Sequence, residues 1–515
     1  MRIEDFPVEM SPLPGAMPVW RGAVDAGQWR ALAQQVRGKG GRIVALWASE
    51  ITGGSRAFEV HMALTVRSGL VWLTLSVPSG QPEFPDVSDI FPAANRMQRA
   101  AFDLLGVRAS DAEDNRQWLR HAAWPAHEFP LRTGFDAAAT YPSEVDRYPF
   151  VQVNGDGVHE IPVGPVHAGT IESGHFRFSV VGERVLRLEE RFGYKHKGIE
   201  KRFEALSILD GVRLAGRISG DSTVAYAWAY CMAAEGAAFF TPTERAQWLR
   251  ALLLERERIA NHLGDLGFLA NDAGLAFGLA QLSRLKEDVL RLNHALFGHR
   301  YLMDAIVPGG VARDVDVDGV QAMRAQIGAL RAEARGLKVI FDEHPGLQDR
   351  FIATGRIAPE LADQLGLCGL VGRASGMSWD LRVQFPPTPY DTLDVRMATH
   401  RNGDVAARVT VRFEEVMESL DLCWVILDRL PRGEVRADLP LPIDNSLGLG
   451  WVEGWRGEVL IAIQTGPNGS LRRVHPHDPS WQNWPLLEHA VIDNIVPDFP
   501  LINKSFNLSY SGVDL

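Results

Sequence analysis

The sequence contains few cysteines. Only three occur in 515 residues, Cys231, Cys368 and Cys423, and they lie far apart. At such spacing they form neither a disulfide framework nor a Cys-x-x-Cys metal site. The pattern favours a reducing compartment, the cytoplasm, and argues against a small secreted protein that depends on disulfide bonds.

Positive charge is also in short supply. The chain has 53 Lys and Arg residues against 64 Asp and Glu, a formal net charge of −11, and its pI is near 5.8. No basic surplus is available to neutralise phosphates. Nucleic acid is therefore not an expected partner.

Long apolar runs are absent as well. The most apolar stretch, residues 224–240 (VAYAWAYCMAAEGAAFF), contains Glu235 and is short for a bilayer span. We expect it to be a buried helix. The first residues, MRIEDFPVEM, are acidic and lack the apolar run of a signal peptide. The sequence thus predicts a soluble protein that can dock onto a membrane complex.

Common nucleotide and zinc motifs are missing too. Neither G-x-x-x-x-G-K-[ST] nor a G-x-G-x-x-G between a strand and a helix occurs, and H-E-x-x-H is absent. Composition is otherwise ordinary, with 46% hydrophobic and 23% charged residues, which excludes wholesale disorder and fibrous repeats. At roughly 150 residues per domain, the length indicates about two to four domains.

Residues 1–135 are predicted to form a small α/β domain. Alternating, β-branched segments at 41–50 and 57–78 are typical of half-buried strands, and residues 94–106 carry apolar side chains at helical spacing. An arm containing Pro and Gly follows. Residues 136–160 are polar and contain Pro, so we interpret them as a linker.

Residues 161–515 are predicted to form a larger, mostly helical domain. Residues 174–192 (GHFRFSVVGERVLRLEERF) alternate around a Gly-Glu turn, which predicts a β-hairpin. The fold class is therefore α+β, a small α/β domain followed by a helical domain with a β-hairpin at its entrance. Apolar periodicity predicts the long helices at 196–213, 221–238, 242–270, 276–298, 318–345 and 404–430.

Two groups of polar residues have ordinary structural interpretations. The turn from Ser219 to Ser222 (SGDS) precedes the Ala-rich helix, where hydroxyl and carboxylate oxygens commonly cap free N–H groups. Glu255, Arg258 and His262 share one helix face, for which a salt-bridged surface is the expected arrangement. Glu257, on the same helix, is likewise expected at the surface.

Several segments resemble a known family. FPDVSDIFPAANRMQRAAFDLLGV and WPAHEFPLRTGF are similar to the 30-kDa subunit of respiratory complex I. GPVHAGTIESGHFRF, FGYKHKGIEK, RIANHLGDLGFLANDAG and EGWRGEV, in that order, resemble its 49-kDa subunit and the related large subunit of nickel–iron hydrogenases. The resemblance covers residues 84–135 and 160–515. It is strongest to the fused large subunits of the group 4 formate hydrogenlyase and hydrogenase 4 systems.

The resemblance implies that four positions correspond to the metal-binding cysteines of the hydrogenases. They are Ser219, Ser222, Ser509 and Gly512, and none is a cysteine. Soft thiolates suit a nickel–iron centre, whereas a serine hydroxyl is a hard, poorly acidic ligand. We therefore expect a hydrogenase-like subunit that binds no metal or other cofactor of its own and is not itself a hydrogenase.

The same resemblance implies roles for other polar residues. Glu172 corresponds to the Glu that passes protons from the hydrogenase metal site, and Arg456 to the Arg suspended over that site. His167 corresponds to the first His of the quinone-site loop of the 49-kDa subunit, and Asp272 to the Asp of its buried His–Asp pair. The candidate catalytic residues are thus Glu172, Asp272 and Arg456, and the residues lining a vestigial metal or quinone pocket are His167, Ser219, Ser222 and Ser509.

The implied function is that of a subunit in a membrane-associated, complex I-like or hydrogenase-4-like oxidoreductase. Such a subunit would transfer electrons to a quinone-type acceptor and couple this transfer to proton or ion movement. The expected partners are a small iron–sulfur subunit, which would hold the iron–sulfur cluster, and quinone-subunit-like and antiporter-like membrane subunits. The expected location is the cytoplasmic face of the cell membrane.

The quinone site of the family is incomplete in this sequence. Gly220 stands where the 49-kDa subunit has its quinone-headgroup Tyr, and Ser173 stands near the place of its second His. A catalytically inert scaffold that holds neighbouring subunits therefore remains the alternative. An open cavity of roughly 300–1,000 Å³ at this place would favour a ligand-binding function.

Overall fold

The computed structural model describes residues 1–51, 57–142, 144–167, 169 and 171–515. Its N-terminal part is built on a five-stranded sheet of order β1-β2-β5-β4-β3, in which β2 and β5 pair in parallel and the other neighbours antiparallel. The strands are β1 (Ser11–Leu13), β2 (Val19–Val24), β3 (Ile43–Ile51), β4 (Ala57–Val66) and β5 (Gly69–Pro78). The last three are the segments predicted to be strands from their alternation.

This sheet is covered on both faces. Helix α1 (Ala26–Gly38) packs against β4 and β5, and helix α2 (Ala94–Leu105) packs against β3. On the other face, Trp47 and Trp72 belong to the same hydrophobic core as the helices of the C-terminal part. The two parts of the chain therefore share a continuous core. A short two-stranded sheet lies beside α2 and consists of β6 (Glu83–Pro85) and β7 (Arg108–Ser110).

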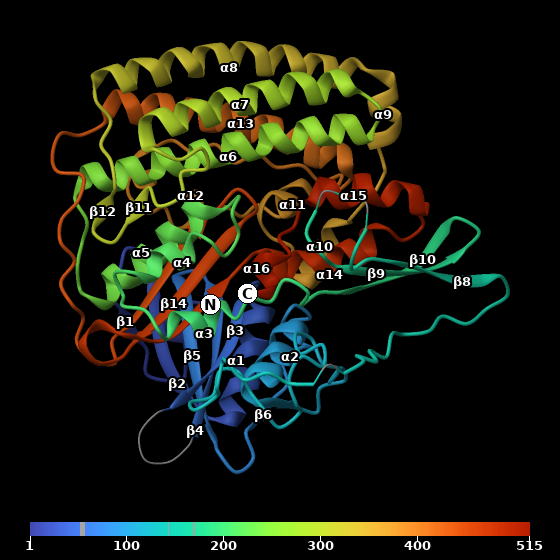
Figure 1. Ribbon diagram of the computed structural model, residues 1–515, viewed down its shortest axis with the longest axis vertical. Helices are drawn as coiled ribbons and strands as arrows, with labels where there is room; N and C mark the ends of the chain where they lie inside the picture. The colour runs from blue at the N-terminus through green and yellow to red at the C-terminus, as the bar shows by residue number, and fades with distance from the viewer. Residues whose placement is uncertain (52–56, 143, 168, 170) are drawn as a thin grey trace.

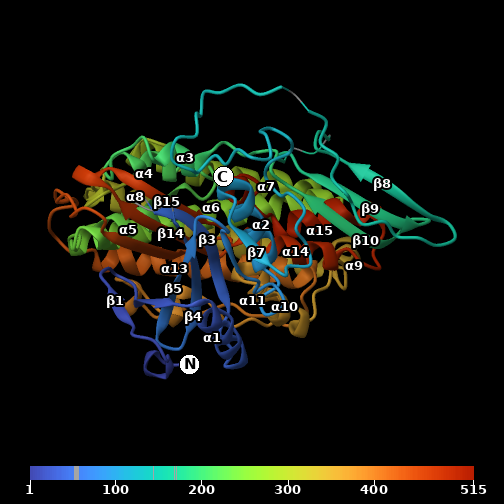
Figure 2. The ribbon, with the colours of Figure 1, turned by 90° about the horizontal axis from the view of Figure 1, so that it is seen from below.

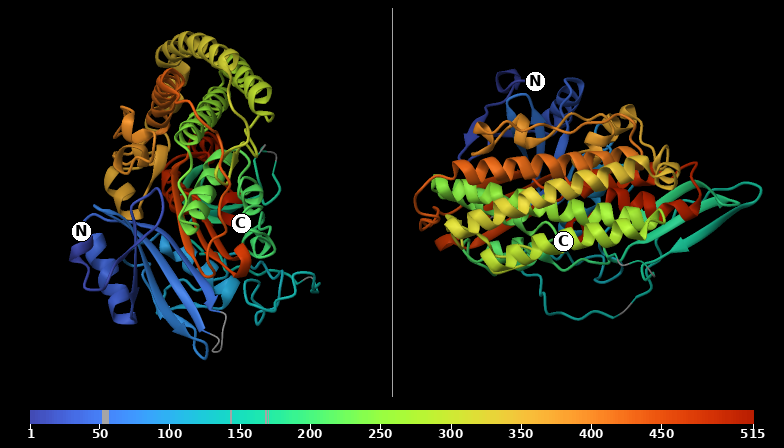
Figure 3. Two further views of the ribbon diagram at one scale, coloured as in Figure 1. Left: turned by 90° about the vertical axis from the view of Figure 1, so that its left-hand side faces the viewer. Right: turned by 90° about the horizontal axis from the view of Figure 1, so that it is seen from above.

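Four long helices lie side by side over the C-terminal part (Figures 1 and 3). The central helix α6 packs against α7 and α13 and is buried along nearly its whole length. Helix α8, at the outside, buries one stripe of residues spaced by three or four positions, which is the pattern of an amphipathic helix. The bounds are α6 (Glu244–Asp272), α7 (Ala276–Phe297), α8 (Val317–Glu343) and α13 (Val405–Arg429).

Helix α5 (Thr223–Ala237) is the expected buried helix, and all its residues are buried. It packs against an antiparallel sheet formed by β13 (Leu447–Glu453), β14 (Glu458–Thr465) and β15 (Leu471–His477). A Cβ at Gly450 would lie 1.8 Å from the carbonyl oxygen of Ala229, so this close contact requires glycine. The sheet was not predicted from the sequence.

The predicted hairpin is present as β9 (His175–Val181) and β10 (Arg184–Arg191). A third strand, β8 (Val158–Val163), pairs with β9, so the linker predicted at 136–160 overlaps the start of this sheet. The three strands project from one side of the molecule, and the segment before β8 runs along its outside (Figure 2).

One predicted helix, at 196–213, is wrong. The segment forms two short helices, α3 (Ile199–Phe203) and α4 (Gly211–Ala215). Between them the backbone pairs with the loop before β15, because Ile208 N donates to the Gly469 carbonyl at 2.9 Å. This long-range pairing replaces the helical hydrogen bonds that local periodicity favoured.

The other predicted long helices are present, with ends shifted by at most two residues. No helix in the described residues combines the length and apolarity needed to cross a bilayer. The remaining short elements are β11 (Ile306–Val307), β12 (Gly310–Val311), α9 (Pro345–Phe351), α10 (Pro359–Leu365), α11 (Gly369–Ala374), α12 (Leu381–Gln384), α14 (Ser480–Ala490), α15 (Phe499–Phe506) and α16 (Ser511–Asp514).

Candidate functional site

The loop before α5 meets the loop between α15 and α16. Ser219 Oγ lies 2.9 Å from Ser509 Oγ, although 290 residues separate them in the sequence. Ser509 Oγ also accepts a hydrogen bond from Gly512 N at 2.9 Å. The Ser219 hydroxyl donates to Asp221 Oδ1 at 3.0 Å. Because a hydroxyl has one proton, Ser509 is the donor in the serine pair. Three of the four predicted positions thus form one hydrogen-bonded chain.

Arg456 connects the fourth position, Ser222, to this chain. Its guanidinium donates to Ser222 Oγ at 3.1 Å and binds both carboxylate oxygens of Asp221 at 2.7 and 2.6 Å. Burial opposes ionisation of Asp221, but the charge of Arg456 outweighs this effect and lowers the Asp221 pKa to about 2. The guanidinium also lies 4.0 Å from the ring of Trp455. Asp221, which sequence analysis did not single out, is the main partner of Arg456.

Asp478 fills the space beside Gly512. A Cβ at Gly512 would lie 2.5 Å from Asp478 Oδ2. This carboxylate is held in place, because Oδ2 accepts a hydrogen bond from the Tyr226 hydroxyl at 2.7 Å and Oδ1 accepts one from Ser480 N at 2.8 Å. Position 512 therefore cannot carry a side chain unless Asp478 moves.

A cavity of about 820 Å³, here called the polar cavity, opens at this cluster. Glu172 lines it together with Ser219 and Ser509, as expected from the resemblance. The Glu172 side chain is half-buried, and its Oε2 accepts a hydrogen bond from Ser511 N at 2.9 Å. Arg456 lines the same cavity, and its guanidinium is bound to Asp221.

A second cavity of about 400 Å³, here called the apolar cavity, adjoins the first. The two share Ile171, Phe268 and Lys504 among their lining residues. His167 and Asp272 line the apolar cavity only. The predicted site residues are therefore divided between two adjoining spaces. The apolar side chains of the second space are Val163, Ile171, Phe176, Phe268, Phe499, Pro500 and Leu508.

His167 and Asp272 are not paired with each other. Within the described residues no hydrogen bond or ion pair joins them, and His167 Nε2 is buried without a partner. Burial raises the pKa of Asp272, and the amide of Asn271 and the ammonium of Lys504 oppose that shift. His167 and Asp272 are thus two separate polar groups that line one cavity.

The N-terminal part matches the family model of the respiratory-chain NADH dehydrogenase 30-kDa subunit over residues 23–141. Residues 272–447 match the model of the 49-kDa subunit of the same enzyme. Formate hydrogenlyase subunit 5 of Escherichia coli is 30% identical over 484 residues, which is 92% of this chain and 85% of that protein. This chain belongs to the family of fused complex I 30-kDa/49-kDa subunits. The resemblance and the fold class expected from the sequence are both confirmed.

The chain is also similar to other proteins of membrane-bound complexes. Hydrogenase-4 component G of Escherichia coli is 29% identical over 470 residues, covering 89% of this chain and 81% of that protein. A chain in the structure of the membrane-bound sulfane sulfur reductase, an archaeal respiratory membrane complex, superposes with a TM-score of 0.66 at 25% identity. It covers 70% of this chain and 99% of that one. The homologues are thus subunits of complex I-like and hydrogenase-4-like complexes.

The nickel–iron centre that the hydrogenase resemblance implies does not fit the residues at this place. The serine hydroxyls bind one another and Asp221, and Gly512 offers no ligand atom. The three cysteines are buried, and none of them lines the polar cavity. No group of three or more His, Cys, Asp or Glu side chains suited to a metal occurs in the described part of the chain. We therefore derive no chemistry through such a centre.

The N-terminus of α5 is capped differently from the prediction. Ser222 is the N-cap residue, but its side chain makes no capping hydrogen bond. Glu257, on α6, instead accepts hydrogen bonds from Val224 N at 2.7 Å and Ala225 N at 3.2 Å. Burial raises the pKa of Glu257 to about 8, although the two N–H donors favour the charged form. The predictions of a serine cap and of a surface position for Glu257 are both wrong.

The predicted salt bridge between Glu255 and Arg258 is present at 3.2 Å, but the predicted surface position is wrong, because Glu255, Arg258 and His262 are fully buried. Helix α6 has neighbours on all sides, so its polar groups find partners inside the protein. His262 Nε2 lies 2.8 Å from Glu415 Oε2, and Arg258 donates to the Glu453 carbonyl at 2.7 Å.

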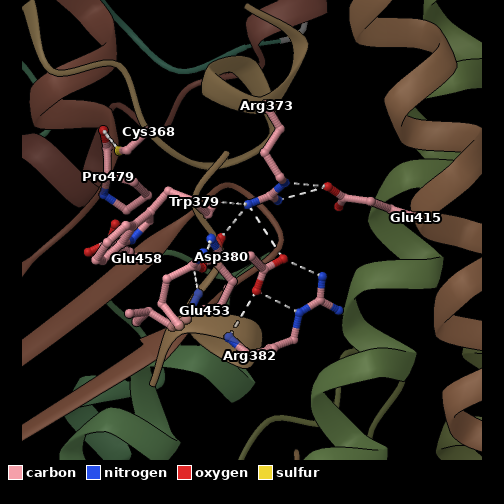
Figure 4. A network of polar contacts seen from close by, with 12 residues as sticks. Cys368, Arg373, Trp379, Asp380, Arg382, Glu415, Glu453, Glu458 and Pro479 are labelled. Atoms are coloured by element: carbon pink, nitrogen blue, oxygen red, sulfur yellow. Dashed lines mark hydrogen bonds and ion pairs between the residues drawn. The ribbon is translucent and has the colours of Figure 1, made fainter. Parts of the chain in front are cut away.

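These residues belong to a larger buried network (Figure 4). Arg373 binds Glu415 at 2.7 Å and Glu453 at 2.8 Å, and Arg382 binds Asp380 at 2.7 Å (Figure 4). The network joins α6, α11, α12, α13 and β13, and β13 leads directly into the loop that carries Arg456. The sequence did not predict it, since charged residues scattered over five elements give no local pattern.

Proposed function

We propose that this chain is a subunit of a membrane-associated, complex I-like assembly that passes electrons to a quinone-type acceptor without a nickel–iron centre. The observation that carries the proposal is the apolar cavity of about 400 Å³ with His167 and Asp272 in its wall. Both cavities fall within roughly 300–1,000 Å³, the range of small-molecule sites. An open space of this kind favours ligand binding over the scaffold interpretation.

The lining of the apolar cavity suits a quinone ring and its tail. Its walls are mainly aliphatic and aromatic, and apolar surface removed from water stabilises a bound ring by the hydrophobic effect. Among the described residues the buried Nε2 of His167 has no hydrogen-bond partner, and it is the group proposed to meet a quinone oxygen. Asp272, with its raised pKa, supplies a carboxyl group that can hold a proton at higher pH than an exposed Asp.

The proposed reaction consumes two electrons and two protons for each quinone reduced to a quinol. The electrons come from an iron–sulfur cluster in a small partner subunit. Asp272 in the apolar cavity and Glu172 in the adjoining polar cavity are the groups proposed to handle protons. Partner subunits of the quinone-subunit and antiporter types would hold the assembly at the cytoplasmic face of the membrane.

A catalytically inert scaffold remains the second candidate. The observation that favours it is the way the former metal positions are filled, with Ser219, Ser509 and Gly512 satisfied by one another and Asp478 occupying the space beside Gly512. In that case the cavities would be closed to ligands by neighbouring subunits.

Quinone titration of the purified complex tests the proposal. Val163→Phe places a ring in the apolar cavity and should weaken binding of a short-chain ubiquinone at least tenfold. Val181→Phe is the matched control, because Val181 lies on the same small sheet but is 42% exposed and outside the cavity. Equal affinity in the two variants, or no saturable binding to the native complex, would establish the scaffold instead. Stoichiometric nickel in the same preparation would contradict the absence of a nickel–iron centre.

A further inference from the structure

Lysine is rare in this chain, and its few copies gather at the polar cavity. The sequence contains seven lysines among its 53 basic residues, and all the others are arginines. Three of the seven, Lys195, Lys286 and Lys504, line this one cavity. Arginine offers a planar fork that suits carboxylate pairs within the protein, whereas lysine is a compact charge with three donors that can turn toward a small ligand.

The arginines near the polar cavity are already neutralised. Arg456 is bound by Asp221 at 2.6 Å, and Arg412 is bound by Asp265 at 3.1 Å. Lys504 is partly neutralised, since its ammonium lies 3.8 Å from Asp265 and 4.8 Å from an aromatic ring. These pairs leave little unbalanced charge on the arginine side of the cavity.

In the described part of the chain, Lys286 and Lys195 have no carboxylate partner, and the Lys286 ammonium lies 5.9 Å from the ring of Tyr301. Among the described residues no carboxylate lies within 4.0 Å of either ammonium, which is the limit for an ion pair. The side chain of Lys286, on α7, lies over Gly264 of α6. A Cβ at Gly264 would lie 2.7 Å from Lys286 Nζ. The missing side chain at Gly264 allows the ammonium to lie at the cavity, and its charge helps to keep Asp221 ionised.

The charges of the residues that line the cavity sum to an excess of one positive. The four cations are Lys195, Lys286, Lys504 and Arg456, and the three carboxylates are Glu172, Asp221 and Asp265. The chain as a whole carries a net charge of −11 and therefore repels anions. The positive charge at this cavity is a local feature of the fold.

The amide side chains of the cavity are committed to the protein. Asn261 Nδ2 donates to the carbonyls of Asp221 and Glu257, and Asn507 Nδ2 donates to Asp265. The proton of Ser219 goes to Asp221. The lysine ammoniums are the charged donors left for a ligand.

We propose that the polar cavity is a binding site for a small anion that carries a carboxylate or an inorganic oxyanion group, with Lys286 as its principal contact and Lys195 and Lys504 adding attraction. The site adjoins the apolar cavity proposed for the quinone and shares Lys504 with it, but it does not require the chain to take part in electron transfer. Cationic ammonium donors form charge-assisted hydrogen bonds with such oxygens.

Calorimetric titration of the intact complex tests this site. Sodium sulfate and sodium acetate are titrated separately at constant ionic strength, so that inorganic and carboxylate ligands are distinguished. One of them should bind saturably, and Lys286→Gln should weaken that binding roughly ten- to hundredfold, the effect of losing one charge-assisted contact. Lys338→Gln is the matched control, because Lys338 lies on the outer helix α8 and pairs with Asp342.

Several results would overturn the proposal. These are no saturable binding of either anion, an unchanged affinity in Lys286→Gln, or an equal loss in Lys338→Gln. Binding to the free chain but not to the complex would show that the lysines serve carboxylates of a partner subunit. Thermal unfolding of each variant establishes that it is folded. Since the titration needs neither turnover nor quinone, its failure is distinguishable from failure of the proposed function.

Discussion

The carboxylate of Asp478 occupies the place into which a side chain at position 512 would project, with only 2.5 Å between Asp478 Oδ2 and a Cβ at Gly512. The Tyr226 hydroxyl and Ser480 N hold the carboxylate there. A side chain at position 512 therefore has no room while Asp478 holds this place. Polar contacts fill the space around Gly512 in this structure.

Gly512→Ala should destabilise the protein by about 1–3 kcal/mol, the usual cost of overpacking. Gly220→Ala is the control, because a Cβ there meets no atom within 4 Å, and we expect a change of less than about 0.5 kcal/mol. Unfolding in urea measures both. Combining Gly512→Ala with Asp478→Ala should cost at least about 0.5 kcal/mol less than the sum of the single changes. Additive costs would show that the two positions do not compete for space.

Restoring cysteine at positions 219, 222, 509 and 512 should not restore stoichiometric nickel. Asp478 lies beside Gly512, and Arg456 is bound by Asp221, so the four sulfur atoms would not have a free space between them. Metal analysis of the quadruple variant, produced together with hydrogenase maturation proteins, measures the result. Nickel in that variant at the level of one atom per chain would show that the polar contacts yield to the metal.

Asp221 should make stability depend on acid pH. Its pKa of about 2 in the folded protein lies below the ordinary value of 3.8, so its ionised form stabilises the fold above the ordinary pKa. This contribution is lost as the pH falls from about 4 to about 2. Asp221→Asn should be less stable at pH 6 and should lose less stability over that range. Asp438→Asn, at an exposed position, is the control, and equal pH profiles for the two variants would contradict the prediction.

Glu257 should make the stability of the fold depend on pH in the opposite direction. Its folded pKa of about 8 lies above the ordinary 4.5, so the folded protein holds a proton that the unfolded chain releases, and stability falls as the pH rises from about 5 to 8. Glu257→Gln removes this titration while one amide oxygen still accepts from the α5 N-terminus. The melting temperature of the variant should therefore fall less than that of the native protein between pH 5 and 8. A parallel fall in both proteins would show that Glu257 does not hold the proton.

Glu172→Gln should assemble normally and lose proton-coupled activity of the complex by roughly a hundredfold, the scale of a lost acid–base group. The amide oxygen can still accept from Ser511 N, so the local structure is retained. Glu183→Gln, on the exposed turn of the β9–β10 hairpin, should change little. If Glu172→Gln keeps full coupled activity, or fails only by preventing assembly, Glu172 has a structural role.

Local pattern was sufficient for most of the architecture. Strands β3, β4 and β5 follow from alternation, and helices such as α6 and α7 follow from a long apolar period, because each pattern reports which face of one element is buried. The segment at 196–213 shows where this reasoning ends. Its helical period was overruled by backbone hydrogen bonds to the loop before β15, which no local window contains.

The sequence by itself determined the family, most of the long helices and the absence of cysteine at the residues that the resemblance relates to metal ligands. Only the tertiary structure decided which charges meet. Arg456 binds Asp221, 235 residues away, and the α5 N-terminus is capped by Glu257 rather than by its own serine. The physical reason is that the partner of a buried charge depends on which elements the core brings together, whereas periodicity along one helix reports only the spacing on that helix. For the same reason the sequence showed seven lysines, and only the fold placed three of them at one cavity.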